Sequence, residues 1–158
     1  MKEGISLLLS DPSDGTIVTD IRIRDFLPAD ADAVRSPWAA AGLKPSRSDT
    51  YEAMAKVATR NPGLASVAED GEGRIFGTAT GADDGRRGWI YQLAAPPNLR
   101  RNGLGLRLVR EMEDRLRARG CEKLTLLVER DNPAAVAFRR RLGYLDDDVV
   151  FLGKWLTP

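Results

Sequence analysis

Histidine is absent from this sequence of 158 residues, and cysteine occurs only once. Without histidine, Ser-His-Asp catalysis and metal sites that contain histidine are excluded, and we expect no metal. The single cysteine, Cys121, cannot form a disulfide within the chain, which fits a reducing compartment. Because Cys121 precedes a predicted buried strand and has no histidine to activate it, we interpret it as a packed residue.

Long apolar runs and a large net charge are missing as well. No run is long enough to span a bilayer, and the apolar run at residues 5–9 is too short for a signal peptide. The net charge of +1 gives no reason to expect a nucleic acid or an anionic membrane as a partner. We therefore expect a cytoplasmic protein that binds neither.

Arginine is abundant in one stretch, with seven arginines between residues 100 and 119. One interpretation is the solvated face of a helix, and the other is a local anion site. A third, nucleic-acid binding, is disfavoured because no aromatic residues lie between these arginines.

The length suits a single domain, which we place at residues 20–158. Residues 1–19 are expected to be a leader, either disordered or an extra edge strand, because residues 11–15 form a cluster of turn-forming residues.

Periodicity and turn residues predict the order of helices and strands within this domain. Strands are expected at residues 21–24, 64–69, 74–81, 88–94 and 123–128, with one or two more within 144–155. Helices are expected at residues 28–41 with a break at Pro37, from Ser48 or Asp49 to about 60, at 104–119 and at 133–142. This order predicts an α/β fold, a mixed central sheet of six to seven strands with helices on both faces.

The segment Arg100-Arg101-Asn102-Gly103-Leu104-Gly105 opens the amphipathic helix at residues 104–119. Glycines let a phosphate approach the backbone closely, and the first amides of a helix are unpaired and favour an anion. Glycines that merely start a helix are the alternative. Neither a dinucleotide fingerprint nor a P-loop matches this segment.

Two motifs resemble the GNAT superfamily of N-acetyltransferases. Residues 93–96 and 99–105 are similar to its motif A, and residues 132–138 and 142–144 are similar to its motif B. The resemblance covers residues 20–156 and implies the GNAT fold and activity. Gly77-Thr78 and residues 84–88 further resemble small bacterial acetyltransferases of the YpeA type.

The resemblance implies that acetyl-CoA is the cosubstrate and a primary amine is the acceptor. Its pyrophosphate would lie on the amides of the arginine- and glycine-rich loop, and its pantetheine arm would pair with the end of the preceding strand. The implied cofactor-binding residues are Leu93, Ala94, Ala95, Arg100, Arg101, Asn102, Gly103, Leu104, Gly105, Asn132 and Arg139. An amide near Leu93 would stabilise the developing oxyanion.

The sequence departs from the family at the proton-transfer positions. Many members carry a carboxylate on or beside the strand at residues 88–94, which has none here. Glu69 is the first candidate base, and the other candidates are Asp83, Asp84 and Glu129. Many members also carry a tyrosine that protonates the thiolate where this chain has Arg139, so Tyr144 is the candidate acid.

These departures leave two functions open. The first is N-acetyl transfer from acetyl-CoA to a small molecule or a protein amino group. The alternative is a CoA-binding module with little turnover. Acceptor contacts are expected from residues 42–51, 83–88 and 144–150. The predicted final strand at residues 149–155 could pair with a second subunit, so a homodimer is possible.

Overall fold

The computed structural model describes residues 9–10, 17–18, 20–44, 46–100 and 102–157. The chain divides into two compact units, Met1–Leu126 and Leu127–Pro158. Our prediction of one domain over residues 20–158 stays a prediction. Most of the leader predicted at residues 1–19 lies outside the described residues. Its described part forms two short strands, β1 (Leu9–Ser10) and β2 (Ile17–Val18), which pair with each other.

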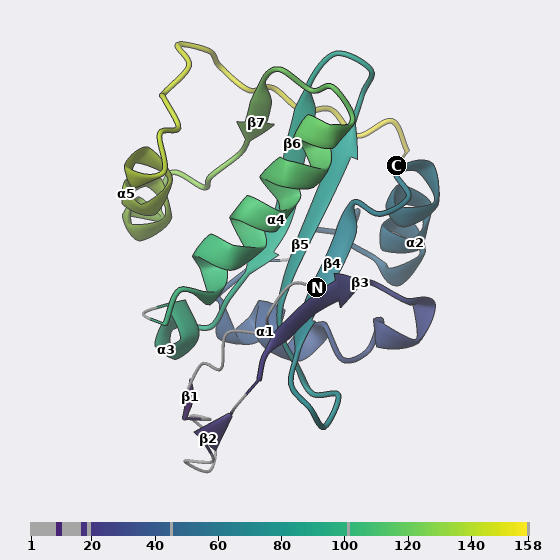
Figure 1. Cartoon of the computed structure of the whole chain (residues 1–158). Helices are drawn as coiled ribbons and strands as arrows, with labels where there is room; N and C mark the ends of the chain where they lie inside the picture. Colours follow the sequence, from purple (N-terminus) through teal and green to yellow (C-terminus); the bar gives the residue numbers. More distant parts are fainter. Residues whose placement is uncertain (1–8, 11–16, 19, 45, 101, 158) are drawn as a thin grey trace. The chain divides into compact units, whose positions relative to one another are not determined.

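The first unit contains a five-stranded sheet in the order β3-β4-β5-β6-β7 (Figure 1). The strands are β3 (Arg22–Asp25), β4 (Ala65–Glu69), β5 (Ile75–Asp83), β6 (Gly88–Ala94) and β7 (Leu124–Leu126). Neighbouring strands from β3 to β6 are antiparallel, whereas β6 and β7 are parallel. The sheet is therefore mixed, as predicted.

Five helical segments accompany this sheet. They are the 3-10 turn η1 (Pro28–Asp30), α1 (Arg35–Ala40), α2 (Tyr51–Arg60), α3 (Pro97–Arg100) and α4 (Leu104–Ala118). The predicted helix at 28–41 is two segments, and Pro37 lies in the first turn of α1, where it breaks no helical hydrogen bond. Thr50, rather than Ser48 or Asp49, caps α2 by accepting from the amide of Ala53.

Three glycines let α4 lie close to one face of the sheet. A Cβ atom on any of them would lie only 2.6 to 3.0 Å from a side-chain atom of α4. The pairs are Gly77 with Leu108, Gly81 with Met112, and Gly88 with Leu116. These glycines therefore set the height of α4 above the sheet, and with it the position of the loop that starts the helix.

The opposite face of the sheet is covered by α1. Successive residues of a strand point to opposite faces, so Thr78 points away from α4, which Gly77 faces. The indole Nε1 of Trp38 on α1 donates a hydrogen bond of 2.9 Å to Thr78 Oγ1. Trp38, Met54 and Val67 belong to the hydrophobic core on this side. Helices thus lie on both faces, as predicted.

The second unit contains α5 (Pro133–Arg141) and no strand among its described residues. Asp131 and Asn132 both suit the N-cap of α5, and the structure uses Asn132, with its Oδ1 accepting from the Ala135 amide at 3.1 Å. The prediction of six to seven strands is wrong, because the main sheet has five and residues 144–155 form no strand. The apolar run at 149–152 favours a strand locally, but a strand needs a partner to pair with, and its side chains are 69% to 86% exposed.

Candidate functional site

The loop before α4 has the geometry of an anion site. Gly103 is the N-cap residue and has a φ of 80°, in the left-handed region that glycine adopts most easily. The first helical hydrogen bond runs from Arg107 N to Gly103 O at 3.0 Å. The amides of Leu104, Gly105 and Leu106 precede that bond, so no carbonyl of the helix can accept from them. Arg101 lies outside the described residues.

A β-bulge interrupts β6 near the same end of the sheet. Thr80 pairs with Tyr91, but Thr78 pairs with Ala94, so β6 holds one residue more than β5 between these two pairs. Gln92 within the bulge has a φ of 36°, which is uncommon for a residue other than glycine. A bulge removes backbone groups from the regular ladder, and Leu93 lies in it.

Thr78 holds the bulge in place. Its hydroxyl donates to the carbonyl oxygen of Gln92 at 2.9 Å and accepts from Trp38 Nε1. Thr78 is only 1% exposed and Trp38 only 5%. The chain of hydrogen bonds therefore runs from α1 through the sheet to the bulge, shielded from water.

The bulge and the start of α4 converge at Gly77. A Cβ atom there would lie 2.9 Å from the carbonyl oxygen of Ala94 and 3.3 Å from Leu104 Cδ2. The parallel pairing of β6 with β7 ends at the pair Ile90 and Leu126, whereas β6 continues to Ala94. The last part of β6 thus extends beyond its parallel neighbour, next to the anion loop.

A cleft of ≈ 210 Å³ lies beside the bulge, between the start of α2 and strands β5 and β6. We call it the α2 cleft. It is lined by Ser48, Asp49, Ala53, Met54, Val57, Thr80, Tyr91 and Gln92. Gln92 belongs to both the cleft and the bulge, so a molecule in the cleft would lie next to the bulged backbone.

Asp49 is the carboxylate of the α2 cleft. Its Oδ1 accepts from Gln92 Nε2 at 2.6 Å, and its Oδ2 accepts from the amide of Ser46 at 2.7 Å. Residues 42–51 were expected to contact the acceptor, but Asp49 itself was predicted only as one of two possible starts of the helix. Thr50 can also cap that helix, as it does in the structure, so the sequence leaves the carboxylate of Asp49 available for another role.

Aromatic rings continue the cleft along β6. The rings of Trp89 and Tyr91 are stacked, with centroids 6.3 Å apart and planes 6° apart. Burial, with a smaller contribution from Asp84, raises the pKa of Tyr91. Trp89 Nε1 donates to Asp84 Oδ2 at 2.9 Å. That hydrogen bond and those from the amides of Arg87 and Arg86 lower the pKa of Asp84 to about 2, which makes Asp84 a weak base.

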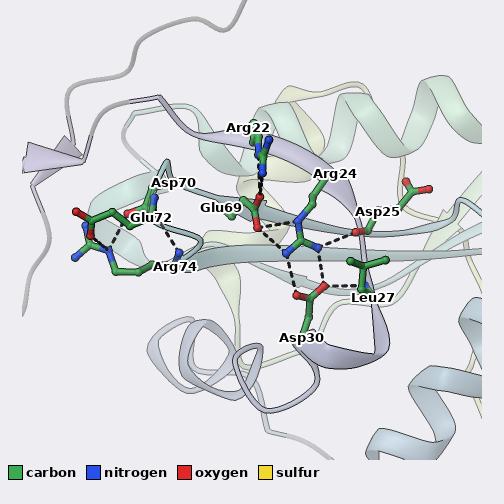
Figure 2. Close-up of polar contacts among 9 residues, drawn as sticks. All are labelled: Arg22, Arg24, Asp25, Leu27, Asp30, Glu69, Asp70, Glu72 and Arg74. Carbon is green, nitrogen blue, oxygen red and sulfur yellow. Dashed lines mark hydrogen bonds and ion pairs between the residues drawn. The ribbon is translucent and has the colours of Figure 1, made fainter.

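Glu69, the first candidate base, lies among charged side chains (Figure 2) and does not line the cleft. Its carboxylate accepts from Arg22 Nε at 2.8 Å and from Arg24 Nε at 2.7 Å, and Arg24 also binds Asp30. We call these four residues the ionic cluster. Its arginines, Arg24 foremost, lower the pKa of Glu69 despite burial.

The register of the sheet separates the ionic cluster from the α2 cleft. Thr80 of the cleft pairs with Ala65, the first residue of β4, whereas Glu69 is the last. At ~3.3 Å per residue, the two positions lie roughly 13 Å apart along the strand. The structure therefore does not bring Glu69 to the cleft.

The remaining predicted site residues belong to the second unit. Arg139 lies with its guanidinium carbon 5.3 Å from the centre of the Phe138 ring, and its carbonyl oxygen accepts from the amide of Tyr144 at 3.2 Å. The side chain of Asn132 caps α5. The roles that we predicted for Asn132, Arg139 and Tyr144 stay predictions. Among the described residues, no helix is long and apolar enough to cross a membrane.

Comparisons with known proteins agree with the family resemblance. A family model described as the acetyltransferase (GNAT) family matches residues 26–144. An acetyltransferase of Pectobacterium atrosepticum is 35% identical over 136 residues, which cover 86% of this chain and 96% of that protein. The fold resembles Ard1 from Thermoplasma volcanium, with a TM-score of 0.70 and 22% identity over 79% of this chain and 82% of that one. It also resembles an aminoglycoside N-acetyltransferase solved with CoA, with a TM-score of 0.68 and 15% identity over 87% and 95% of the two chains.

Proposed function

Because this chain belongs to the GNAT acetyltransferase family, we propose that it transfers an acetyl group from acetyl-CoA to a primary amine. The observation that carries this proposal is the convergence at Gly77 of the anion loop before α4 and the bulged end of β6. The loop before α4 suits a pyrophosphate, and the bulged end of β6 suits a thioester.

Each feature has a defined part in binding acetyl-CoA. The amides of Leu104 and Gly105, which open α4, would hold the pyrophosphate, aided by the positive end of the helix dipole. Main-chain groups of Leu93, Ala94 and Ala95 would pair with the pantetheine arm. The three glycines under α4 support this arrangement, because they hold the helix against β5 and β6.

The reaction that we propose is direct attack. The neutral amine attacks the carbonyl carbon of the thioester, the C–N bond forms, and the C–S bond breaks so that CoA leaves as a thiolate. An amide near Leu93 stabilises the oxyanion, an effect worth about 3–4 kcal/mol per donor in other enzymes. Tyr144 stays the proposed proton donor to the thiolate. We do not assign the base to Glu69, because hydrogen bonds from Arg24 and Arg22 occupy its carboxylate and lower its pKa, which makes it a weak base.

The second candidate function is a CoA-binding module with little turnover. Arg139 at the position of the family's tyrosine favours it, because a guanidinium is a poor proton donor at neutral pH. Cytoplasmic location, a homodimer and the closer relation to the YpeA type stay predictions. For the homodimer, the strand that we expected at residues 149–155 is not formed in this structure.

A matched pair of variants tests the anion loop. We expect Gly103→Asp to weaken acetyl-CoA binding at least about tenfold relative to Gly103→Asn, because an added negative charge repels the pyrophosphate. Both residues tolerate the left-handed conformation, and a Cβ at Gly103 meets no atom within 4 Å. Calorimetric titration with acetyl-CoA measures the difference, and thermal melts check folding.

The outcomes separate the two candidate functions. Micromolar binding by the native chain, with loss in Gly103→Asp only, supports the proposed cosubstrate site. Binding without release of CoA thiol toward any amine supports the binding module. No binding by the well-folded native chain would contradict both.

A further inference from the structure

The α2 cleft is built for a small molecule with an apolar body. Ala53, Met54 and Val57 form a wall on α2. Its volume is ≈ 210 Å³, well above the ~10–15 Å³ that a single water molecule needs. A short aliphatic chain fits such a space and gains by covering the apolar wall.

One end of the cleft carries a negative charge that its hydrogen-bond partners do not neutralise. Asp49 accepts from two neutral donors, the Ser46 amide and the Gln92 side-chain amide. A carboxylate has about four lone-pair sites, so further donors can bind it. In the ionic cluster, two arginines balance the negative charge of Glu69. The two neutral donors to Asp49 do not balance the charge of its carboxylate.

The sheet side of the cleft also favours a cation. Tyr91 lines the cleft, is 38% exposed, and has its ring stacked on Trp89. The face of an aromatic ring attracts an ammonium group within about 6 Å. Asp49 and Tyr91 thus select for the same charge from two parts of the fold, the loop before α2 and strand β6.

We propose that the α2 cleft is the acceptor site and that it selects short aliphatic diamines. This inference rests on the proposed function. Asp49 holds one ammonium group, the methylene chain lies on Met54 and Val57, and the second amino group reaches the bulge of β6 next to Gln92. The acceptor needs two amino groups, because a carboxylate favours the protonated form of the amine that it binds, and a protonated amine cannot attack.

The transfer leaves the held ammonium unchanged. The second amino group attacks as the neutral amine, forms the C–N bond, and displaces CoA as the C–S bond breaks. The attacking nitrogen releases its proton to water, and the departing thiolate takes a proton from the proposed donor, Tyr144, which water then reprotonates. The product is a diamine with one acetyl group and one free ammonium.

A series of three amines with the same four-carbon chain tests the inference. The compounds are 1,4-diaminobutane, 4-aminobutan-1-ol and 4-aminobutanoate. Opposite the amine to be acetylated, they carry a positive ammonium, a neutral hydroxyl and a negative carboxylate, respectively. Release of CoA thiol gives kcat/KM for native protein, Asp49→Asn and the control Asp32→Asn. Asp32 is a suitable control because its side chain is 91% exposed and its ion pair with Arg35 lies on the surface.

We expect the native protein to prefer the diamine over the amino alcohol by about 10- to 100-fold, the range for a hydrogen bond to a charged group. Aminobutanoate is expected to be the poorest substrate. Asp49→Asn should abolish this preference through the KM of the diamine and should lower kcat/KM for the amino alcohol much less, because a hydroxyl binds a carboxylate more weakly than an ammonium group does. Asp32→Asn should behave as the native protein does.

Three results would overturn the inference. The first is a native preference for the amino alcohol or for aminobutanoate, and the second is an equal loss with all three amines in Asp49→Asn. The third is calorimetric binding of acetyl-CoA with no acetylation of any of the three, which leaves the proposed cosubstrate site intact. Failure to bind acetyl-CoA would instead remove the proposed function, and the inference with it.

Discussion

The ionic cluster and the α2 cleft each contain a carboxylate, but the two carboxylates have opposite surroundings. Glu69 is 3% exposed and lies between the guanidinium groups of Arg22 and Arg24 (Figure 2). Asp49 borders a cleft and accepts only from neutral amides in the hydrogen bonds that the structure shows. Arginines of the fold balance the charge of Glu69. The charge of Asp49 has no such partner among its hydrogen bonds, and we therefore propose that it binds a cationic ligand.

The difference teaches how to recognise a functional carboxylate in this chain. A buried charge is expensive unless a partner compensates it, so the ionic cluster is explained by its own members. It joins β3, β4 and the turn at Asp30. A carboxylate beside a cavity with neutral donors has no such explanation, which is why we connect Asp49 with binding of the acceptor and Glu69 with stability.

The sharpest test of this comparison is Glu69→Gln, which has the largest expected effect on stability. It should lower the free energy of unfolding by about 3 kcal/mol, because it leaves the buried end of Arg24 only partly compensated. Urea titration measures the loss. Glu72→Gln is the control, since Glu72 is 78% exposed and lies 3.5 Å from Arg74, and it should cost less than about 0.5 kcal/mol. A loss of activity per folded molecule in Glu69→Gln would break the comparison.

Thr78→Val is expected to have the next largest effect, and it acts on the cleft side. The change keeps the shape of the side chain but removes the bridge between Trp38 and Gln92. We expect a loss of about 2 kcal/mol, since a buried donor and a buried acceptor lose their partner, and a lower kcat because the bulge is held less firmly.

The control for that variant is Thr125→Val. The hydroxyl of Thr125 is buried without a hydrogen-bond partner among the described residues. The same chemical change should therefore be neutral or slightly stabilising there. Equal losses in the two variants, by urea titration, would show that the bridge contributes nothing.

Mild acid should have the smallest of these effects, and it should act on the ionic cluster. Hydrogen bonds from Arg24 are the main cause of the lowered pKa of both Asp30 and Glu69. Their stabilisation is therefore present above the unfolded pKa of about 4 and is lost as pH falls through the lower folded pKa values. At pH 4 only the upper edge of this window is reached, so the loss should be smaller than that in Thr78→Val.

The measurement is a set of urea titrations between pH 7 and pH 3. Native protein should lose stability steadily below about pH 4. Glu69→Gln should show a flatter profile, because one of the two carboxylates no longer titrates. Parallel profiles for the two proteins would mean that the arginines do not lower the pKa of Glu69.

Local signals in the sequence were sufficient for the start of α4 and for most other elements. Gly103 and Gly105 at the start of an amphipathic run predict the start of α4, and the structure begins that helix at Leu104. Asn132 and Pro133 likewise predict the start of α5 correctly. These features depend on residues within one turn of each other, and local patterns carry such information.

Features that depend on strand pairing were not predicted. Nothing in residues 88–94 indicates an extra residue, since the bulge exists only relative to Thr78 and Thr80 on β5. The pairing of Arg22 with Glu69 joins residues 47 positions apart. Without that register Glu69 resembled an available base. The strands expected at residues 144–155 are not formed for the same reason, because an apolar run in the sequence does not supply a partner strand.

The hydrogen-bond chain through Thr78 also gives the protein an optical label of its own. Three tryptophans are present in the sequence, and Trp38 is joined to the bulge by two successive hydrogen bonds through the hydroxyl of Thr78. Its indole is 5% exposed, so its fluorescence depends on the groups around it rather than on the buffer. In a chain that keeps Trp38 and replaces the other two tryptophans by phenylalanine, the emission spectrum would report movement of Gln92 in real time, without an attached dye.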